Sequence, residues 1–227
     1  MAHPLDNPAW LTLTGHHAAI AVGTDTARRF APGYSPILGF ADNTRPDFAA
    51  LLPFCDSGEH FYVAGWDGIV PAGWVLDDEA TMFRMVWADQ PLPPADDATE
   101  QIVALGPEHA DQAMALAALT APGPFGRRTV ELGDYIGLFD QGQLVAMAGE
   151  RMRAGHYCEI SGVCTHPDYQ HRGLATRLMQ VLIRRQRTRG ETPFLHVMSS
   201  NPEAHHVYLR LGFADFTQPV VRVVSRL

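Results

Sequence analysis

The sequence predicts an α+β protein in which a small N-terminal α+β unit precedes a larger α+β domain. The chain has 227 residues, 46% of them apolar, which is enough material for a sizeable buried core. Strand-like and helix-like patterns alternate through the second half. A segment rich in proline and aspartate, residues 88–97, interrupts these patterns and is typical of a linker. We therefore expect domains at residues 1–97 and 98–227.

The first hundred residues contain few clear elements. Residues 47–54 are expected to form a short helix, because Phe48, Leu51 and Leu52 fall at helical spacing. Residues 60–64 and 80–87 are expected to be strands. This part contains no motif with a chemistry that can be named.

The second half has a clearer order of elements, β-β-β-α-β-α-β after a first helix. The expected elements are a helix at 107–119, strands at 135–139, 144–151 and 157–165, a helix from about residue 172 to Gly190, a strand at 194–198, a helix at 202–211 and a strand at 220–224. The last helix has the strongest start signal, with Asn201 as its N-cap and Pro202 in its first turn. Gly212 is the expected stop.

Composition excludes several classes of protein. The net charge of −8 argues against general nucleic-acid binding, and no apolar run is long enough to span a membrane. Three cysteines without a C-x-x-C pair predict neither a disulfide framework nor a cysteine zinc site, and we expect no metal. We expect a soluble, cytoplasmic protein. Thirteen of its 17 basic residues, all arginines, lie after residue 100, which suits an anionic ligand there.

An anion site is expected where a turn enters the helix after residue 170. The segment reads Gln170-His171-Arg172-Gly173-Leu174-Ala175-Thr176. A glycine at this place lets a ligand approach the backbone closely. The first amides of a helix have no partner within it and bind anions such as a pyrophosphate. The spacing is neither that of a P-loop nor that of a dinucleotide-binding loop.

Three blocks of sequence together carry a family resemblance. They are the strand from Glu159 to Pro167, the Q-x-x-G-x-A loop at 170–175, and the pattern of Asn201, Ala204, Tyr208, Gly212 and Phe213. The segment from 159 to 213 resembles the GNAT superfamily of acyl-coenzyme-A-dependent N-acyltransferases. The resemblance covers about residues 101–227 and implies an α/β/α fold with a mixed, mostly antiparallel sheet and a V-shaped splay. The two-part layout is similar to that of the glycine N-acyltransferase branch, although no motif supports that branch.

The resemblance also implies a set of site residues. Acetyl-coenzyme A, or another acyl-coenzyme A, is the implied co-substrate, and no metal is needed. The amides of Val163 and Cys164 are implied to stabilise the oxyanion, and Tyr208 to protonate the leaving thiolate as general acid. The residues implied to bind the coenzyme are Val163, Cys164, Thr165, Gln170, His171, Arg172, Gly173, Leu174, Ala175, Thr176, Asn201 and Tyr208.

The acceptor amine needs to lose a proton, because a lysine-like amine has a pKa of ~10.4. Glu159 is the candidate general base, since it occupies the strand position where several family members carry a catalytic glutamate. Partial burial between Cys158 and Ile160 is expected to raise its pKa. A water chain is the alternative base. The histidines at 156, 166 and 196 are rival candidates.

The sequence therefore predicts an N-acetyltransferase that acts on a small-molecule or peptide amine by direct attack in a ternary complex. The alternative is a module that senses acyl-coenzyme A without turning it over, and the substitution Tyr208→Phe separates the two. Residues 1–97 are open to interpretation as a degenerate copy of the same fold that serves as a substrate platform or in a homodimer.

Overall fold

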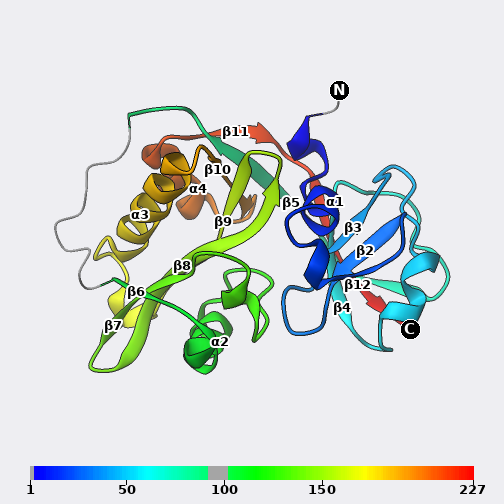
Figure 1. Cartoon of the computed structure of the whole chain (residues 1–227), viewed down its shortest axis with the longest axis horizontal. Coiled ribbons are helices and arrows are strands. Elements are labelled where there is room, and N and C mark those ends of the chain that lie inside the picture. The colour runs from blue at the N-terminus through cyan, green and yellow to red at the C-terminus, as the bar shows by residue number, and fades with distance from the viewer. Residues whose placement is uncertain (1–2, 92–101) are drawn as a thin grey trace.

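The computed structural model describes residues 3–91 and 102–227 of the chain (Figure 1). Its helices are α1 (Pro8–Thr14), α2 (Ala110–Thr120), α3 (Leu174–Thr188) and α4 (Pro202–Leu211). Its strands are β1 (Ala21–Gly23), β2 (Ala27–Phe30), β3 (Leu38–Phe40), β4 (His60–Ala64), β5 (Trp74–Trp87), β6 (Ile102–Ala104), β7 (Ile136–Asp140), β8 (Gln143–Ala154), β9 (Tyr157–Thr165), β10 (Thr192–Met198), β11 (Phe213–Thr217) and β12 (Val220–Arg226). No helix in these parts of the chain combines the length and the apolar character needed to cross a membrane.

Most of the strands form one large sheet. Its order is β4-β12-β5-β10-β9-β8-β7-β6, and β11 also pairs with β5. Strands β9 and β10 run parallel because helix α3 crosses between them, whereas the other pairings described in this sheet are antiparallel. The expected mixed, mostly antiparallel sheet of an α+β fold is therefore confirmed.

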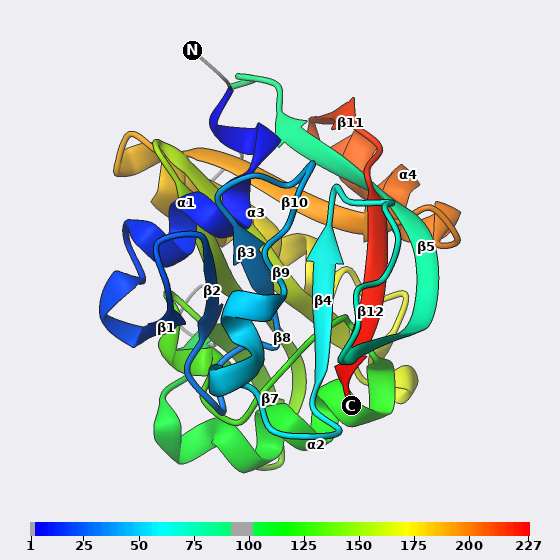
Figure 2. The same ribbon diagram turned by 90° about the vertical axis from the view of Figure 1, so that its right-hand side faces the viewer.

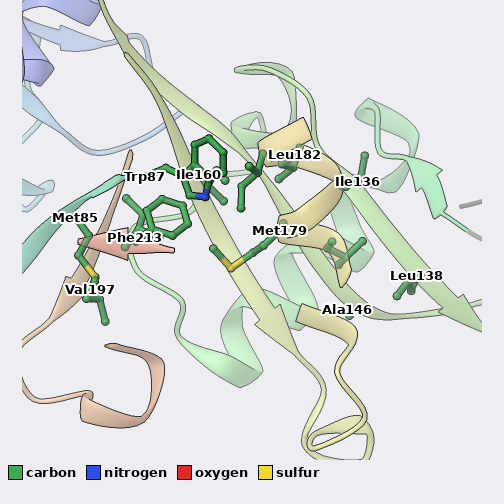
Figure 3. Close-up of a cluster of buried hydrophobic side chains, with 14 of the residues drawn as sticks. Met85, Trp87, Ile136, Leu138, Ala146, Ile160, Met179, Leu182, Val197 and Phe213 are labelled. Atoms are coloured by element: carbon green, nitrogen blue, oxygen red, sulfur yellow. The ribbon is translucent and has the colours of Figure 1, made fainter. Parts of the chain in front are cut away.

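Helix α3 covers one face of this sheet. Its apolar residues recur at the helical period, so that Leu178, Met179, Leu182 and Ile183 are all fully buried. They pack against side chains that point to the same face from several strands (Figure 3), namely Met85, Trp87, Ile136, Leu138, Ala146, Ile160 and Val197. This core fixes α3, and with it the turn that enters the helix, relative to the sheet.

The first part of the N-terminal half, before β4, covers the opposite face. Helix α1 and the small sheet β1-β2-β3 lie in front of β8, β9 and β10 in Figure 2. Leu5, Leu13 and Phe30 pack there against Met152 of β8 and Phe194 of β10. Since neighbouring residues of a strand point to opposite faces, this second core is separate from the one beneath α3. The part of the N-terminal half that precedes β4 is thus a second layer over the sheet.

The sheet opens where β9 and β10 diverge. The two strands pair only over Thr192–Phe194 and Tyr157–Glu159, and no pairing between their later residues is described. Strand β9 also bulges against β8, because Cys164 pairs with Met147 but Ser161 pairs with Gly149. Gly162 lies within this bulge with a φ of 63°, which favours glycine. The expected V-shaped splay is present and is centred on residues 160–165.

The two halves of the chain share the large sheet. Strand β4 pairs with β12, and β5 pairs with β10, β11 and β12. The expected linker at 88–97 and the boundary at 97/98 fall largely outside the described residues, which stop at 91 and resume at 102. The division into domains at 1–97 and 98–227 stays a prediction.

Most of the expected elements are present, but some of their bounds differ and several elements were not expected. The strands expected at 60–64 and 157–165 match β4 and β9, and residues 49–54 form a 3-10 helix. The strand expected at 80–87 begins earlier, at Trp74, because pairing with β12 extends it through the exposed, acidic segment 75–79, which carries no apolar alternation. The expected list lacks α1, the short strands β1, β2, β3 and β6, and β11.

Candidate active site

A cavity of about 440 Å³ lies where the sheet splays. Residues 160–163 of β9 and 196–198 of β10 line it, together with Asn201 and Tyr208 from the α4 side. Residues of the N-terminal half close it, among them Tyr62, Ala80 and Arg84. The cavity is therefore built by both halves of the chain around the divergence of β9 and β10. It is large enough for the reacting ends of two small molecules.

The predicted anion site lies at the start of α3. Gly173 is the N-cap of the helix with a φ of 75°, and His171 has a φ of 60°. The first backbone hydrogen bond of the helix runs from the Arg177 N–H to the Gly173 carbonyl. The amides of residues 173–176 precede that bond and have no partner one turn back. A Cβ at residue 173 would meet no atom within 4 Å, so the space above the glycine is open.

Arg172 is held beside this turn. Its Nη2 donates a hydrogen bond to the Asp168 carbonyl at 2.8 Å, and its guanidinium lies over the Tyr169 ring. The Tyr169 hydroxyl in turn donates to Asp140 at 2.6 Å. An exposed arginine and a row of free helix amides together suit a pyrophosphate. Gln170 and Thr176 flank this arrangement.

Tyr208 faces the cavity from α4. The helix begins as the sequence predicts, because the Asn201 side chain accepts a hydrogen bond from the Ala204 N–H at 3.0 Å. The Tyr208 ring is half-buried and packs near Phe213 against the core beneath α3. Burial raises the pKa of Tyr208 to about 12. The phenol therefore keeps its proton at neutral pH and is able to donate it.

The bulged strand brings backbone amides to the same cavity. Neither Gly162 nor Val163 has a register partner on β8, and Val163 also lies past the last residue of β9 that pairs with β10. The next two predicted residues, Cys164 and Thr165, do not line the cavity. The Cys164 side chain is buried in the core under α2, and burial raises the pKa of its thiol to about 11. The Thr165 hydroxyl is buried and has no hydrogen-bond partner among the described residues.

Glu159 is fully buried and paired. The Arg151 Nε and Nη2 donate to its two carboxylate oxygens at 2.9 Å and 2.7 Å. Burial alone raises the pKa of Glu159, but the Arg151 charge and a hydrogen bond from His196 outweigh it and lower the pKa to about 2. The expectation that burial raises this pKa into a useful range is therefore wrong, because the sequence does not show that Arg151 of the neighbouring strand β8 pairs with Glu159.

Glu159 belongs to a row of polar side chains that crosses four strands. Arg84 of β5 donates from Nε to His196 Nε2 at 2.9 Å, and His196 Nδ1 lies 2.8 Å from Glu159 Oε1. An arginine only donates, so Nε2 of the histidine accepts and Nδ1 carries the proton toward Glu159. Burial lowers the pKa of His196, although Glu159 partly opposes it. The imidazole is therefore neutral between Arg84 on one side and the Glu159–Arg151 pair on the other.

Comparison with known proteins identifies the family. A family model for FR47-like protein matches residues 135–221. A GNAT-family protein of known structure from Novosphingobium aromaticivorans is 35% identical, with 100% of each chain covered and a TM-score of 0.90. The chain belongs to the GNAT family of acetyltransferases. No curated protein matches the sequence.

More distant GNAT structures share the fold over nearly the whole chain. A GCN5-related N-acetyltransferase from Kribbella flavida is 15% identical and has a TM-score of 0.60, with 96% of this chain and 93% of that chain covered. A GCN5-related N-acetyltransferase-like protein from Streptococcus suis is 14% identical with a TM-score of 0.59, and the match covers 96% and 92% of the two chains. Both matches include the N-terminal half. Similarity to the glycine N-acyltransferase branch stays a prediction.

Two rival histidines lie away from the GNAT cavity. His166 caps a 3-10 helix, where its ring accepts from the Asp168 N–H, and the His156 ring contacts the Tyr157 ring at the β8–β9 turn. Neither lines the cavity. Only His196 among the three does so, and both of its ring nitrogens have protein partners.

One cluster of acidic and thiol groups lies outside the cavity. Ligand atoms of Glu150, Cys158 and Glu191 come within 4.8 Å of one another. Arg153 and Arg189 each form ion pairs with both carboxylates, and burial raises the pKa of the Cys158 thiol. The guanidinium groups already supply the positive charge that such a cluster attracts.

Sequence reasoning missed the cavity residues of the N-terminal half. Arg84 is the most informative of them, because it is only 4% exposed and forms one end of the polar row. A signal was present in the sequence, where Arg84 stands between Phe83 and Met85 in an otherwise apolar run. A charged residue inside a buried strand needs a polar partner or a ligand.

Proposed function

We propose that this GNAT protein transfers an acetyl group from acetyl-coenzyme A to a primary amine of a small molecule by direct attack in a ternary complex. The observation that carries the proposal is the cavity at the splay, where Tyr208 and the bulged residues 162–163 line one space. The turn into α3, in the connection between the same two strands, has free helix amides that suit the phosphates of the coenzyme. This combination provides for both the phosphates and the thioester of the coenzyme.

The proposed binding of the coenzyme uses the chain's backbone more than its side chains. The amides of residues 173–176 and the positive end of the α3 dipole bind the pyrophosphate, and Arg172 adds a charge at the exposed side. The free Nδ2 of Asn201 lines the cavity beside Tyr208, where it is able to contact the pantetheine arm. Thr165 stays a predicted coenzyme contact, but its hydroxyl is buried and the residue does not line the cavity.

The proposed reaction forms a C–N bond and breaks a C–S bond at the acetyl carbon. The neutral amine attacks the thioester carbonyl, and the carbonyl oxygen takes up negative charge that the Val163 N–H stabilises. When the intermediate collapses, the thiolate leaves and takes a proton from the Tyr208 hydroxyl, and Tyr208 regains a proton from the water that accepted the amine proton, so that the protons balance. A coenzyme thiol resembles a cysteine thiol with a pKa of ~8.5. The higher pKa of Tyr208, about 12, keeps the donor protonated until the thiolate forms.

The geometry favours water over Glu159 as the acceptor of the amine proton. Both carboxylate oxygens accept hydrogen bonds from Arg151, and one also faces His196. A carboxylate with a pKa near 2 is a weak base. We assign Glu159 a positioning role, because it fixes Arg151 and the tautomer of His196 beside the cavity. The amine proton therefore passes to water in the cavity.

The test of the proposal is thiol release from acetyl-coenzyme A by the purified protein against a panel of primary amines. An acetyltransferase releases one thiol per acetylated amine, with saturation in both substrates. Coenzyme binding measured by calorimetry in parallel separates the alternative. Tight binding of acetyl-coenzyme A without release by any acceptor would indicate a sensor. A cytoplasmic location and a homodimer stay predictions from the sequence.

A further inference from the structure

The Arg84 side chain is buried without an acidic partner. It is 4% exposed, and no carboxylate among the described residues lies within ion-pair distance of it. Its Nη1 donates to the Leu5 carbonyl, and its Nε donates to the neutral His196 ring at 2.9 Å. Its Nη2 has no hydrogen-bond partner within the described chain, and the residue lines the cavity. Arg84 thus presents a free N–H group and a full positive charge to the cavity.

The charges that line the cavity do not balance that of Arg84. Arg151 and Glu159 neutralise each other through a two-point ion pair. The other acidic residue at the cavity is Asp78, which is exposed, so that water screens its charge. Glu159 and Asp6 act on Arg84 only at longer range, and burial lowers the pKa of Arg84 to about 10. A buried cation of this kind is stabilised by an anion that enters the cavity.

The coenzyme does not supply that anion. Its phosphates are assigned to the turn into α3, and its acetyl end is uncharged. The anion must therefore be part of the acceptor, which shares the cavity of about 440 Å³ with the thioester. An enclosed space of this size suits a small molecule. A planar guanidinium with a free Nη2 matches a carboxylate, and Arg151, which lines the same cavity, uses only its Nε and Nη2 on Glu159.

We infer that the acceptor is a small amine that carries a carboxylate, and that Arg84 binds this carboxylate while the amine faces the thioester. The inference rests on the proposed function and names the class of acceptor. Its chemistry is that of an amino acid, in which the carboxylate and the amine lie at opposite ends of a short chain. Arg84 is then the residue that selects the acceptor, in a part of the chain outside the sequence motifs.

Matched acceptors test this inference. The panel pairs each amino acid with its primary amide, for example glycine with glycinamide and 4-aminobutyrate with 4-aminobutanamide. 4-Aminobutyrate and its amide are the better matched pair, because the carboxylate is too far from the amine to change the pKa of the amine much. For whichever carboxylate acceptor has the higher kcat/KM, we expect this value to exceed that of its amide by roughly 10- to 100-fold, which is the effect of one hydrogen-bonded charge.

Two arginine variants locate the effect. In Arg84→Gln the ratio of kcat/KM between carboxylate and amide should fall to near 1. This ratio does not depend on the fraction of folded enzyme, so partial unfolding of the variant does not hide the result. Arg29→Gln is the matched control, because Arg29 is also 4% exposed but pairs with Glu59 away from the cavity. The control should keep the ratio of the unmodified protein.

Binding without turnover separates this inference from the proposed function. Calorimetry compares N-acetyl-4-aminobutyrate with its primary amide on the unmodified protein, and the carboxylate form should bind at least roughly 10-fold more tightly. Thiol release with equal rates for acids and amides, or an unchanged ratio in Arg84→Gln, would overturn the carboxylate site and leave the transferase intact. If none of the acceptors gives thiol release, the proposed function is overturned. The calorimetric comparison of the acid with its amide would then still decide whether the cavity binds a carboxylate.

Discussion

Replacing Glu159 with glutamine should destabilise the protein strongly. The substitution keeps the size of the side chain but removes the charge that pairs with Arg151 inside the structure. The Arg151 side chain is 9% exposed and has no second carboxylate within reach among the described residues. Glu159→Gln therefore leaves a buried, unpaired guanidinium, which is the costly way to break a buried ion pair.

The size of the effect follows from the pKa of Glu159. The structure lowers this pKa from an ordinary 4.5 to about 2. At ~1.4 kcal/mol for each pKa unit, the ionised form contributes roughly 3 kcal/mol to the free energy of unfolding at neutral pH. Loss of one partner of a buried pair typically costs about 3–5 kcal/mol, which agrees. Because the folded pKa is the lower one, this stability is present above about pH 4.5 and is lost as the pH falls toward 2.

Urea unfolding at pH 7, followed by tryptophan fluorescence, measures the change. We expect Glu159→Gln to lower the free energy of unfolding by about 3 kcal/mol. Glu131→Gln is the control, since its ion pair with Arg128 lies at the surface and should be worth under ~1 kcal/mol. The gap between Glu159→Gln and the unmodified protein should narrow as the pH falls toward 3. Equal, small losses for both substitutions would refute the buried ion pair.

Three further predictions concern the coenzyme site. Gly173→Ala should weaken binding of acetyl-coenzyme A in calorimetry, because the φ of 75° at this position strains any other residue by about 1 kcal/mol. Gly190→Ala is the control and should bind normally, since Gly190 has a φ of 76° but lies at the far end of α3. Equal affinities for both variants would contradict the anion site. Cys164 should not react with an alkylating reagent at pH 8, and the treated protein should keep its activity, because this thiol is buried with a pKa of about 11. Inactivation that mass spectrometry traces to Cys164 would count against this. At a fixed concentration of neutral amine the rate should be flat from about pH 7 to 9, because Tyr208 has a pKa of about 12, and a fall over that range would argue against Tyr208 as the acid.

The sequence carried enough local information to predict the turn, α3 and the start of α4, which form the proposed coenzyme half of the site. Gly173 and the apolar stripe after it predict the turn and α3, and the Asn201 cap predicts the start of α4. Both signals act within one or two helical turns. Tyr208 follows from the second signal, because it lies on the helix that Asn201 begins. Its place beside the cavity agrees with this, while its role stays a proposal.

The proposed acceptor half depends on contacts that no local pattern shows. Arg84 meets His196 across 112 residues of chain, through the pairing of β5 with β10. The pKa of Glu159 was expected to rise with burial, but its direction is set by Arg151 on the neighbouring strand. Such pairings depend on strand register and on the layer that the N-terminal half forms. The charge of a buried residue could be read from the sequence, but its partner could not.

The rate of thiol release from the complex already loaded with acetyl-coenzyme A tests acetyl transfer at the splay most directly. In a single turnover with excess amine, we expect Tyr208→Phe to react roughly 100-fold more slowly while the affinity for acetyl-coenzyme A stays within about 2-fold. Tyr157→Phe, which removes a hydroxyl that contacts His3 outside the cavity, is the control and should react at the unmodified rate. An unchanged rate in Tyr208→Phe would contradict the account.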